Sequence, residues 1–252
     1  DFEVAGKADF REYVNRLKHT IESAAEGGDV AKFKHCLGIW HRPEFSKILE
    51  LEGYNEHKFG PAIWSAAEQD FVDILKVANS FQLELDYKQS LTGRHIIHDV
   101  AEKNAAGALE YMLEHGVDVD RRDGCGRTAY FAAAYSGAVD AIKVLDMYGL
   151  DVNAPSEKGD TVLHYISATH FDTTGKRGDS QPEFESLPLL LQLGADPEIE
   201  NDDGKKAIDI ARENSKDDLV SSIESWQKSK PYRDAMLEID ISYPELELPG
   251  QA

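Results

Sequence analysis

Two histidines and an aspartate lie close together in the segment His95-x-x-His98-Asp99. Imidazole nitrogens and carboxylate oxygens are common metal ligands, which makes this cluster a candidate metal site. A second segment, GKRG at 175–178, combines glycines with basic side chains, as phosphate-binding loops do. It lacks both the GxxxxGKS/T spacing and a following apolar helix, so we do not predict a phosphate site there.

No arrangement for covalent or acid–base catalysis stands out. The sequence has no GxSxG motif, and acidic pairs such as Asp217-Asp218 are expected at solvated helix positions. The two cysteines, Cys36 and Cys125, are far apart, form no CxxC pair and have no histidine at a zinc-ligand spacing. We expect free, structural thiols in a reducing intracellular compartment: the cytoplasm, the nucleus or both. The sequence thus predicts no enzyme activity, no cofactor and no metal beyond the histidine candidate.

The charge balance restricts the class of partner. Lysine and arginine number 27 and the acidic residues 47, so the net charge is 27 − 47 = −20. This argues against nucleic-acid or anionic-membrane binding, which needs clustered basic side chains. It permits a basic protein partner, although solubility alone also explains such a charge. No apolar run is long enough to span a bilayer and no basic start precedes an apolar run, so we expect no membrane insertion and no signal peptide.

Glycines recur at a fixed interval. Gly93, Gly126 and Gly159 lead three similar stretches, and 126 − 93 and 159 − 126 both equal 33. A fourth stretch begins at Gly204, 45 residues later, which is one period plus 12. A period of this length predicts a stack of short units, each burying its apolar face only against its neighbours.

The periodic part of the chain resembles the ankyrin repeat. TVLH at 161–164 is similar to the family's Thr-Pro-Leu-His, and AAYSG at 133–137 to its Ala-Ala-x-x-Gly centre. Segments 116–120, 149–153 and 193–196 are similar to its Gly-Ala-Asp-Val-Asn ending. The resemblance implies an all-α solenoid of helix–turn–helix repeats joined by β-hairpin-like loops.

We predict about six repeats over residues 1–225. Their expected ranges are 14–57 and 58–88 (degenerate), 89–121 and 122–154 (regular), 155–199 (with a 12-residue insert) and 200–225 (the last repeat). Residues 226–252 are predicted to form a C-terminal cap, with Trp226 and Tyr232 over the last repeat, and an acidic tail. We expect the last helix to end near Lys230-Pro231, because a proline disfavours helix in the residue before it.

The insert, at about 170–185, is predicted to lie between the two helices of its repeat. It is either a tolerated surface loop or a lip beside the groove that carries Lys176 and Arg177 toward a partner. Helix ends are easier to place. Gly137 and Gly149 are expected to end helices in the left-handed conformation, and Thr128 and Thr161 to cap the helices that follow them.

The resemblance also bears on individual polar residues. His98 occupies the position of His164, which implies a hydrogen bond to the backbone of a neighbouring turn, in place of metal binding. Some ankyrin proteins are substrates of an asparaginyl hydroxylase, and the pattern around Asn153 implies such a modification site. The alternative for Asn153 is a local hydrogen bond within its hairpin.

The repeat register predicts which residues face a partner. Arg121, Arg122 and Arg127 are expected to form a basic spot near Phe131 and Tyr135, a composition typical of interface hot spots. Alternatively, Arg121 and Arg122 pair with local acids, and Tyr130 or Phe131 fills the core. The full set predicted to bind a partner, on the groove and the hairpin tips, is Lys88, Arg94, Asp99, Lys103, Arg121, Arg122, Arg127, Phe131, Tyr135, Lys158, Tyr165 and His170.

The function predicted from these features is a non-enzymatic scaffold that acts as a monomer and binds a protein or peptide in its ankyrin groove. Two alternatives stay open. One is a chaperone-like acidic cap for a basic client protein, suggested by the net charge of −20. The other is the regulatory or targeting region of a larger enzyme or effector, suggested by the absence of an initiator methionine.

Overall fold

The computed structural model describes residues 7–51, 59–89, 91–168 and 182–238. Within these ranges the chain is all-α, as predicted, with thirteen helices and no strand. Among the described residues, antiparallel pairing is limited to two isolated bridges, Lys88–His95 and Glu200–Lys206, which close the hairpin-like loops before α6 and α12. In the described ranges, no helix is both long enough and apolar enough to cross a bilayer.

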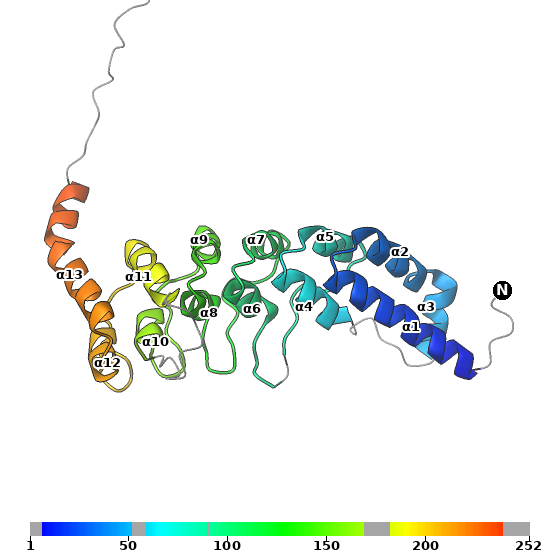
Figure 1. The fold of residues 1–252 in the computed structure, drawn as a ribbon, viewed down its shortest axis with the longest axis horizontal. Coiled ribbons are helices and arrows are strands. Elements are labelled where there is room, and N and C mark those ends of the chain that lie inside the picture. Colours follow the sequence, from blue (N-terminus) through cyan, green and yellow to red (C-terminus); the bar gives the residue numbers. More distant parts are fainter. Residues whose placement is uncertain (1–6, 52–58, 90, 169–181, 239–252) are drawn as a thin grey trace, which may run out of the picture.

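The helices form two rows, which run the length of an elongated molecule (Figure 1). One row contains α4, α6, α8, α10 and α12, and the other contains α5, α7, α9 and α11; α1 and α2 continue the array at its N-terminal end. The bounds are α1 Lys7–Glu26, α2 Val30–Trp40, α3 Pro43–Leu51, α4 Gly60–Glu68, α5 Val72–Ser80, α6 Ile96–Glu102, α7 Ala106–Glu114, α8 Ala129–Ser136, α9 Val139–Met147, α10 Val162–Ala168, α11 Pro182–Gln192, α12 Ala207–Glu213 and α13 Asp217–Glu238.

We call the row of α4, α6, α8, α10 and α12 the first row and the other the second row. Small side chains allow the first-row helices to approach closely. Ala129, Ala133 and Ala134 of α8 are fully buried, and α8 contacts α6, α10 and α11. The second helix of the same pair, α9, buries Ile142 and Leu145 completely. These side chains belong to one apolar cluster that extends from α1 to α13. No repeat has a core of its own, which confirms the stacking expected from the periodicity.

The predicted helix ends are partly confirmed. Gly137 is the C-cap of α8 with a φ of 69°, and Gly149, with a φ of 79°, directly follows the C-cap of α9. Thr128 and Thr161 precede α8 and α10, as expected. The capping prediction is wrong for Thr128, because its hydroxyl makes no capping hydrogen bond and has no partner in the described part of the chain.

In the second row (α5, α7, α9 and α11), α7 and α9 each receive a cap from a residue that follows an earlier first-row helix. Asp70 and Asn104 follow α4 and α6 in the left-handed conformation, with φ of 61° and 56°. Asn104 Oδ1 accepts the backbone N–H groups of Asp140 (3.1 Å) and Ala141 (3.0 Å) in the first turn of α9. Asp70 accepts that of Ala108 in α7 in the same way. The N-cap residues of α7 and α9 are alanines, so these helices depend on their neighbour for this bond.

Asn104→Ala is expected to lower the free energy of unfolding by about 2 kcal/mol, through the lost cap and the strain of alanine at positive φ. Asn104→Gly is the matched control. It loses the same cap but tolerates the left-handed conformation, so we expect a loss of about 1 kcal/mol. Urea denaturation followed by circular dichroism measures both. Equal losses would show that backbone strain contributes nothing at this position.

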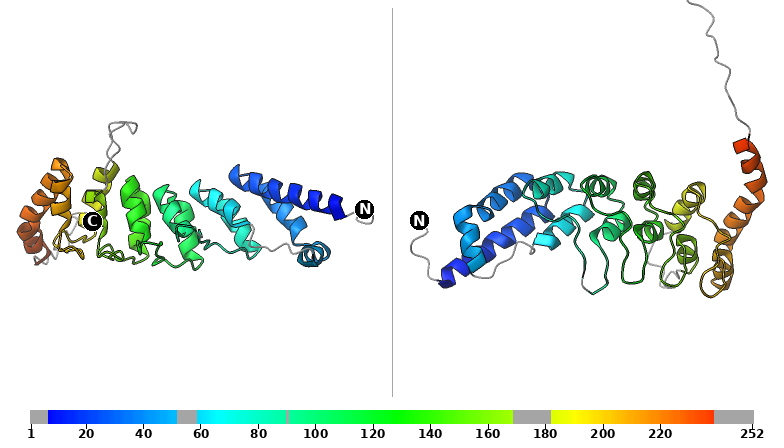
Figure 2. Two further views of the ribbon diagram at one scale, coloured as in Figure 1. Left: turned by 90° about the horizontal axis from the view of Figure 1, so that it is seen from below. Right: turned by 180° about the vertical axis from the view of Figure 1, so that it is seen from behind.

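Single backbone hydrogen bonds join the tips of successive hairpins. Gly124 N–H donates to Thr92 O (3.1 Å), Glu157 N–H to Cys125 O (3.1 Å) and Asp202 N–H to Lys158 O (3.2 Å). The turns therefore follow one another along one edge of the array (Figure 2). This edge is where the leading glycines of the period lie.

The two ends of the array differ from the prediction. The range 14–57, predicted as one repeat, contains α3 in addition to α2 and most of α1, one helix more than a helix–turn–helix unit has. At the other end, α13 passes residue 230 and continues to Glu238, so the predicted helix end near Lys230-Pro231 is wrong. Trp226 is partly buried against the apolar cluster, as a cap requires. The side chain of Tyr232 and the predicted acidic tail at 239–252 lie outside the described residues.

The insert can be described only at its C-terminal end. Helix α11 begins at Pro182, so residues 182–185 are helical. The prediction that the insert extends to about residue 185 is therefore wrong for these four residues. Proline is favoured at the first position of a helix, where its missing N–H is not needed. The predictions for His170, Lys176 and Arg177 concern residues 169–181, which lie outside the described residues.

Candidate functional site

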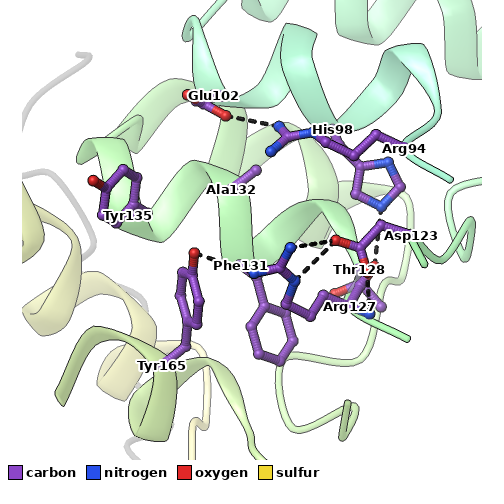
Figure 3. Close-up of a pocket in the computed structure, with 10 residues that line it drawn as sticks. All are labelled: Arg94, His98, Glu102, Asp123, Arg127, Thr128, Phe131, Ala132, Tyr135 and Tyr165. Carbon is purple, nitrogen blue, oxygen red and sulfur yellow. Dashed lines mark hydrogen bonds and ion pairs between the residues drawn. The ribbon is translucent and has the colours of Figure 1, made fainter. Parts of the chain in front are cut away.

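A pocket of about 210 Å³ lies on the face formed by the first-row helices, around α8 and between α6 and α10 (Figure 3). We call it the α8 pocket. Its walls combine three aromatic rings with two arginine–carboxylate pairs. The lining residues are Arg94, His98, Glu102, Asp123, Arg127, Thr128, Phe131, Ala132, Tyr135 and Tyr165.

His98 has a structural role at the base of the pocket. Its Nδ1 accepts the His95 N–H at 3.2 Å, and its Nε2–H donates to the Arg127 carbonyl at 3.0 Å. His164 is arranged in the same way, between the Thr161 N–H (3.1 Å) and the Lys205 carbonyl (2.9 Å). The predicted bond to a neighbouring turn is confirmed for both histidines. Burial lowers the pKa of His98, so the neutral ring is favoured.

With both ring nitrogens bonded to the backbone, His98 has no lone pair left for a metal. The described residues contain no group of three or more histidine, cysteine or acidic side chains placed to hold a metal ion. The cluster His95-x-x-His98-Asp99 is therefore explained by hairpin packing.

One arginine is shared by several carboxylates on the α6 side of the pocket. Arg94 Nη2 lies 2.6 Å from Asp99 Oδ1 and 2.7 Å from Glu102 Oε2. Burial raises the pKa of Asp99 to about 6, opposed by Arg94 and assisted by the nearby charges of Glu68 and Glu102. Ionisation of Asp99 is thus less favourable than that of an ordinary aspartate, even though a guanidinium contacts it.

A second ion pair closes the opposite side and is complete in itself. Arg127 Nη2 and Nε lie 2.7 and 2.9 Å from Asp123 Oδ2, and the Cys125 N–H donates to Asp123 Oδ1. Although burial would raise the pKa of Asp123, the hydrogen bonds from Arg127 and Cys125 hold it below its usual value. The Arg127 guanidinium also lies over the Tyr165 ring, 5.3 Å from its centroid, and bonds the Tyr165 hydroxyl at 3.3 Å.

The three rings come from neighbouring helices. Phe131 and Tyr165 meet edge to face with centroids 5.6 Å apart, and Tyr135 lies 6.1 Å from Tyr165. Phe131 is buried at the pocket wall, whereas Tyr135 and Tyr165 are half-buried. Tyr130 points into the core with 1 % of its surface exposed, so the alternative that Tyr130 fills the core is correct.

Two polar atoms of the pocket residues lack a partner. Thr128 is 1 % exposed, and its hydroxyl oxygen makes no hydrogen bond in the described part of the chain. Arg94 Nε is in the same situation. Buried polar atoms are nearly always satisfied in native proteins, so such atoms at a pocket call for an explanation.

The structure brings together half of the residues predicted to bind a partner. Arg94, Arg127, Phe131, Tyr135 and Tyr165 line the α8 pocket, and Asp99 adjoins it through Arg94. The remaining described residues lie away from its lining. Of these remaining residues, Arg121 is half-buried, and the exposed ones are Lys88, Lys103, Arg122 and Lys158.

The predicted basic spot needs correction. The alternative is confirmed for Arg121, whose Nη2 lies 2.6 Å from Asp86 Oδ2. Arg127, which the alternative did not include, pairs with Asp123. Arg122 donates to the carbonyls of Gly126 and Pro155, so it joins two successive hairpins. Two of the three charges are therefore neutralised by carboxylates of the chain itself.

Sequence reasoning missed Glu102, Asp123 and Thr128 as pocket residues. Glu102 could have been found, because it lies three residues after Asp99 and thus on the same helix face. Asp123 could also have been found, because it stands four residues before Arg127. Nothing in the sequence indicates that the Thr128 hydroxyl lacks a partner.

Asn153 connects two repeats. Its Nδ2 donates to Gly194 O at 2.9 Å, and its Oδ1 accepts the Asp196 N–H at 2.8 Å. The alternative of a bond within its own hairpin therefore needs correction, since both polar atoms bond the following repeat.

Comparison with known proteins is informative for this region. Residues 97–145 match the family described as "Ankyrin repeats (many copies)". The chain is 32 % identical over 125 residues to the E3 ubiquitin-protein ligase hecd-1 of Caenorhabditis elegans. The aligned stretch covers 50 % of this chain and 4 % of that protein. It is 29 % identical over 119 residues to Ankyrin repeat and SOCS box protein 11 of Danio rerio, covering 47 % and 36 %. The matched region is a minor part of each relative.

Proposed function

We propose that this chain, an ankyrin repeat-containing protein, is a non-enzymatic binding module that takes a protein or peptide partner in the groove of α6, α8 and α10. Ankyrin repeats are generally protein-interaction modules, and their first helices are open on one face. The partner would lie across the α8 pocket and place a side chain in it.

The observation that carries this proposal is the composition of the α8 pocket. Tyr135 and Tyr165 are large, half-buried aromatics beside charged side chains, the composition that dominates the energetics of interfaces. The Thr128 hydroxyl and Arg94 Nε would gain hydrogen-bond partners from a bound chain or from water that it traps. A pocket that served packing alone would have been filled by apolar side chains.

We propose that each successive pair of helices forms one repeat, six in all, with α3 as an addition between the first two pairs. The outer contacts of a partner would be the exposed or half-buried basic side chains of the hairpin edge and the end of α6. These are Lys88, Lys103, Arg121, Arg122 and Lys158.

A random-peptide phage library tests the proposal, with the full chain as bait. We expect the intact protein to enrich a family of peptides, and Tyr135→Ala to weaken binding of the best synthetic peptide roughly 30-fold, because truncating an aromatic hot spot costs about 2 kcal/mol. Tyr135 is half-buried at the pocket, so the variant is expected to fold.

Tyr148→Ala is the matched control. Tyr148 is also half-buried, but it directly follows α9 in the second row, away from the groove. We expect its peptide affinity to stay within about twofold of the intact protein. Failure to enrich any peptide family, or enrichment of peptides that bind Tyr135→Ala as well as the intact protein, would contradict the proposal.

A second candidate function follows from the relatives. The C. elegans protein is an E3 ubiquitin-protein ligase, and the stretch that matches it is 4 % of its length. We propose, as the alternative, that this chain is the partner-binding region of a larger enzyme. The full transcript tests it: a reading frame without a catalytic domain would contradict this alternative and leave the binding function intact.

A further inference from the structure

We propose that the partner of the α8 pocket is a basic segment, which places a lysine or arginine side chain beside Glu102 and against the ring of Tyr135. This inference rests on the proposed function and adds the chemistry of the partner. The sequence left the charge of the partner open, since the arginines near the groove favoured an acidic partner and the net charge a basic one.

The charges around the pocket do not balance. The lining contains two guanidinium groups and two carboxylates, and two further carboxylates lie next to it: one contacts Arg94 and the other acts on the first through its charge. With all groups ionised, the local charge is 2 − 4 = −2. These groups are Arg94, Arg127, Glu68, Asp99, Glu102 and Asp123. The local excess has the same sign as the net charge of −20, so both the site and the whole molecule attract a cation.

The imbalance is confined to the α6 side. Arg127 is fully occupied by Asp123 and by the ring and hydroxyl of Tyr165. Arg94 is the single cation between Asp99 and Glu102, and Glu68 adds a third negative charge close to Asp99. A second cation in this position would complete the network that Arg94 leaves incomplete.

The free protein carries a cost for this arrangement. The raised pKa of Asp99 means that its ionised form is destabilised by burial and by the two neighbouring glutamates. Chains retain such unfavourable charges mainly at functional sites, where a ligand relieves them. A lysine or arginine of the partner would do so, whereas a carboxylate would increase the repulsion.

The aromatic wall suits the same side chain. Arg127 over Tyr165 already demonstrates that a guanidinium packs on a ring in this pocket. No described residue places a cation over Tyr135, and none forms a hydrogen bond with its hydroxyl. The stem of a lysine or arginine can pack on this ring while its charged end reaches Glu102. The buried Thr128 hydroxyl supplies a further polar contact within the pocket.

The test uses the peptides selected on the intact protein. We expect the enriched family to be rich in lysine and arginine and poor in acidic residues. The best peptide is then synthesised in two forms, as selected and with its basic residues changed to glutamate. Their affinities are measured by calorimetry against the intact full chain and two charge variants.

The first variant, Glu68→Gln with Glu102→Gln, removes two charges at the pocket and is expected to bind the basic peptide about tenfold more weakly. The second, Glu110→Gln with Glu114→Gln, removes two charges from exposed positions on α7. It has the same net charge as the first, and we expect its affinity to stay within about twofold of the intact protein. Denaturant midpoints of both variants verify that they fold.

The outcomes separate the two proposals. Enriched peptides that are acidic or neutral but still require Tyr135 would overturn the basic partner and leave the binding function standing. Equal weakening of the basic peptide by both variants would also overturn it, because general attraction to an acidic protein would then suffice. If no enriched family depends on Tyr135, the binding function fails and the basic partner fails with it.

Discussion

Alanine in place of Gly126 is expected to lower the free energy of unfolding by about 3 kcal/mol. Gly126 has a φ of 73°, a left-handed conformation in which a Cβ costs about 1 kcal/mol. The added Cβ would lie 2.9 Å from Glu157 N and 2.8 Å from Glu157 Cγ. Glu157 N is held by its hydrogen bond to Cys125 O, so the Cβ can be accommodated only if two hairpins separate.

Gly149→Ala separates these two contributions. Gly149 has a φ of 79°, but a Cβ there would meet no atom within 4 Å. This variant suffers the backbone strain without the collision, and we expect a loss of about 1 kcal/mol. Both variants are compared by urea denaturation under one set of conditions. A loss for Gly126→Ala no larger than that for Gly149→Ala would mean that the hairpin tips are not held against each other.

Replacing His98 with alanine is expected to cost about 3 kcal/mol. The change creates a cavity in a buried position and leaves the Arg127 carbonyl and the His95 N–H without the ring nitrogens that they bond. His115→Ala is the control, because His115 is exposed and bonds only its own helix, at Tyr111 O. We expect that control to change stability by less than about 0.5 kcal/mol.

His98 also makes stability depend on pH. Its pKa in the folded protein is lowered from the model-peptide value of 6.5, so the unfolded chain takes up the proton more readily. The contribution of His98 is therefore complete above pH 6.5 and is lost as the pH falls toward the lower folded pKa. As the pH falls from neutral to below 6.5, the free energy of unfolding should decrease less for His98→Ala than for the intact protein. An unchanged slope would contradict the buried, neutral state of the ring.

The repeat architecture could be predicted because its determinants are local. A glycine at positive φ, as at Gly137 and Gly149, is required by the backbone of one turn, so its spacing in the sequence reports the spacing of the turns. The role of His98 could be predicted for the same reason, since its position relative to the hairpin is fixed by the motif. The rings at the α8 pocket followed from the register of the first helices.

What could not be predicted depends on which side chains meet across repeats. The pairing of Arg121 with Asp86 joins residues 35 positions apart, and the sequence offers several acids for each arginine. The caps that Asp70 and Asn104 supply to later helices are equally distant. The course of α13 past residue 230 was missed because proline weakens a helix without always ending it.

The caps given by Asp70 and Asn104 have a direction, because each residue serves a helix that comes later in the chain. During synthesis the N-terminal repeats leave the ribosome first and begin to fold first. When α9 emerges, Asn104 already stands at the end of a helix made before it. For α7 and α9, the order of translation thus matches the order of dependence, since each of these helices meets a residue already placed to cap its first turn.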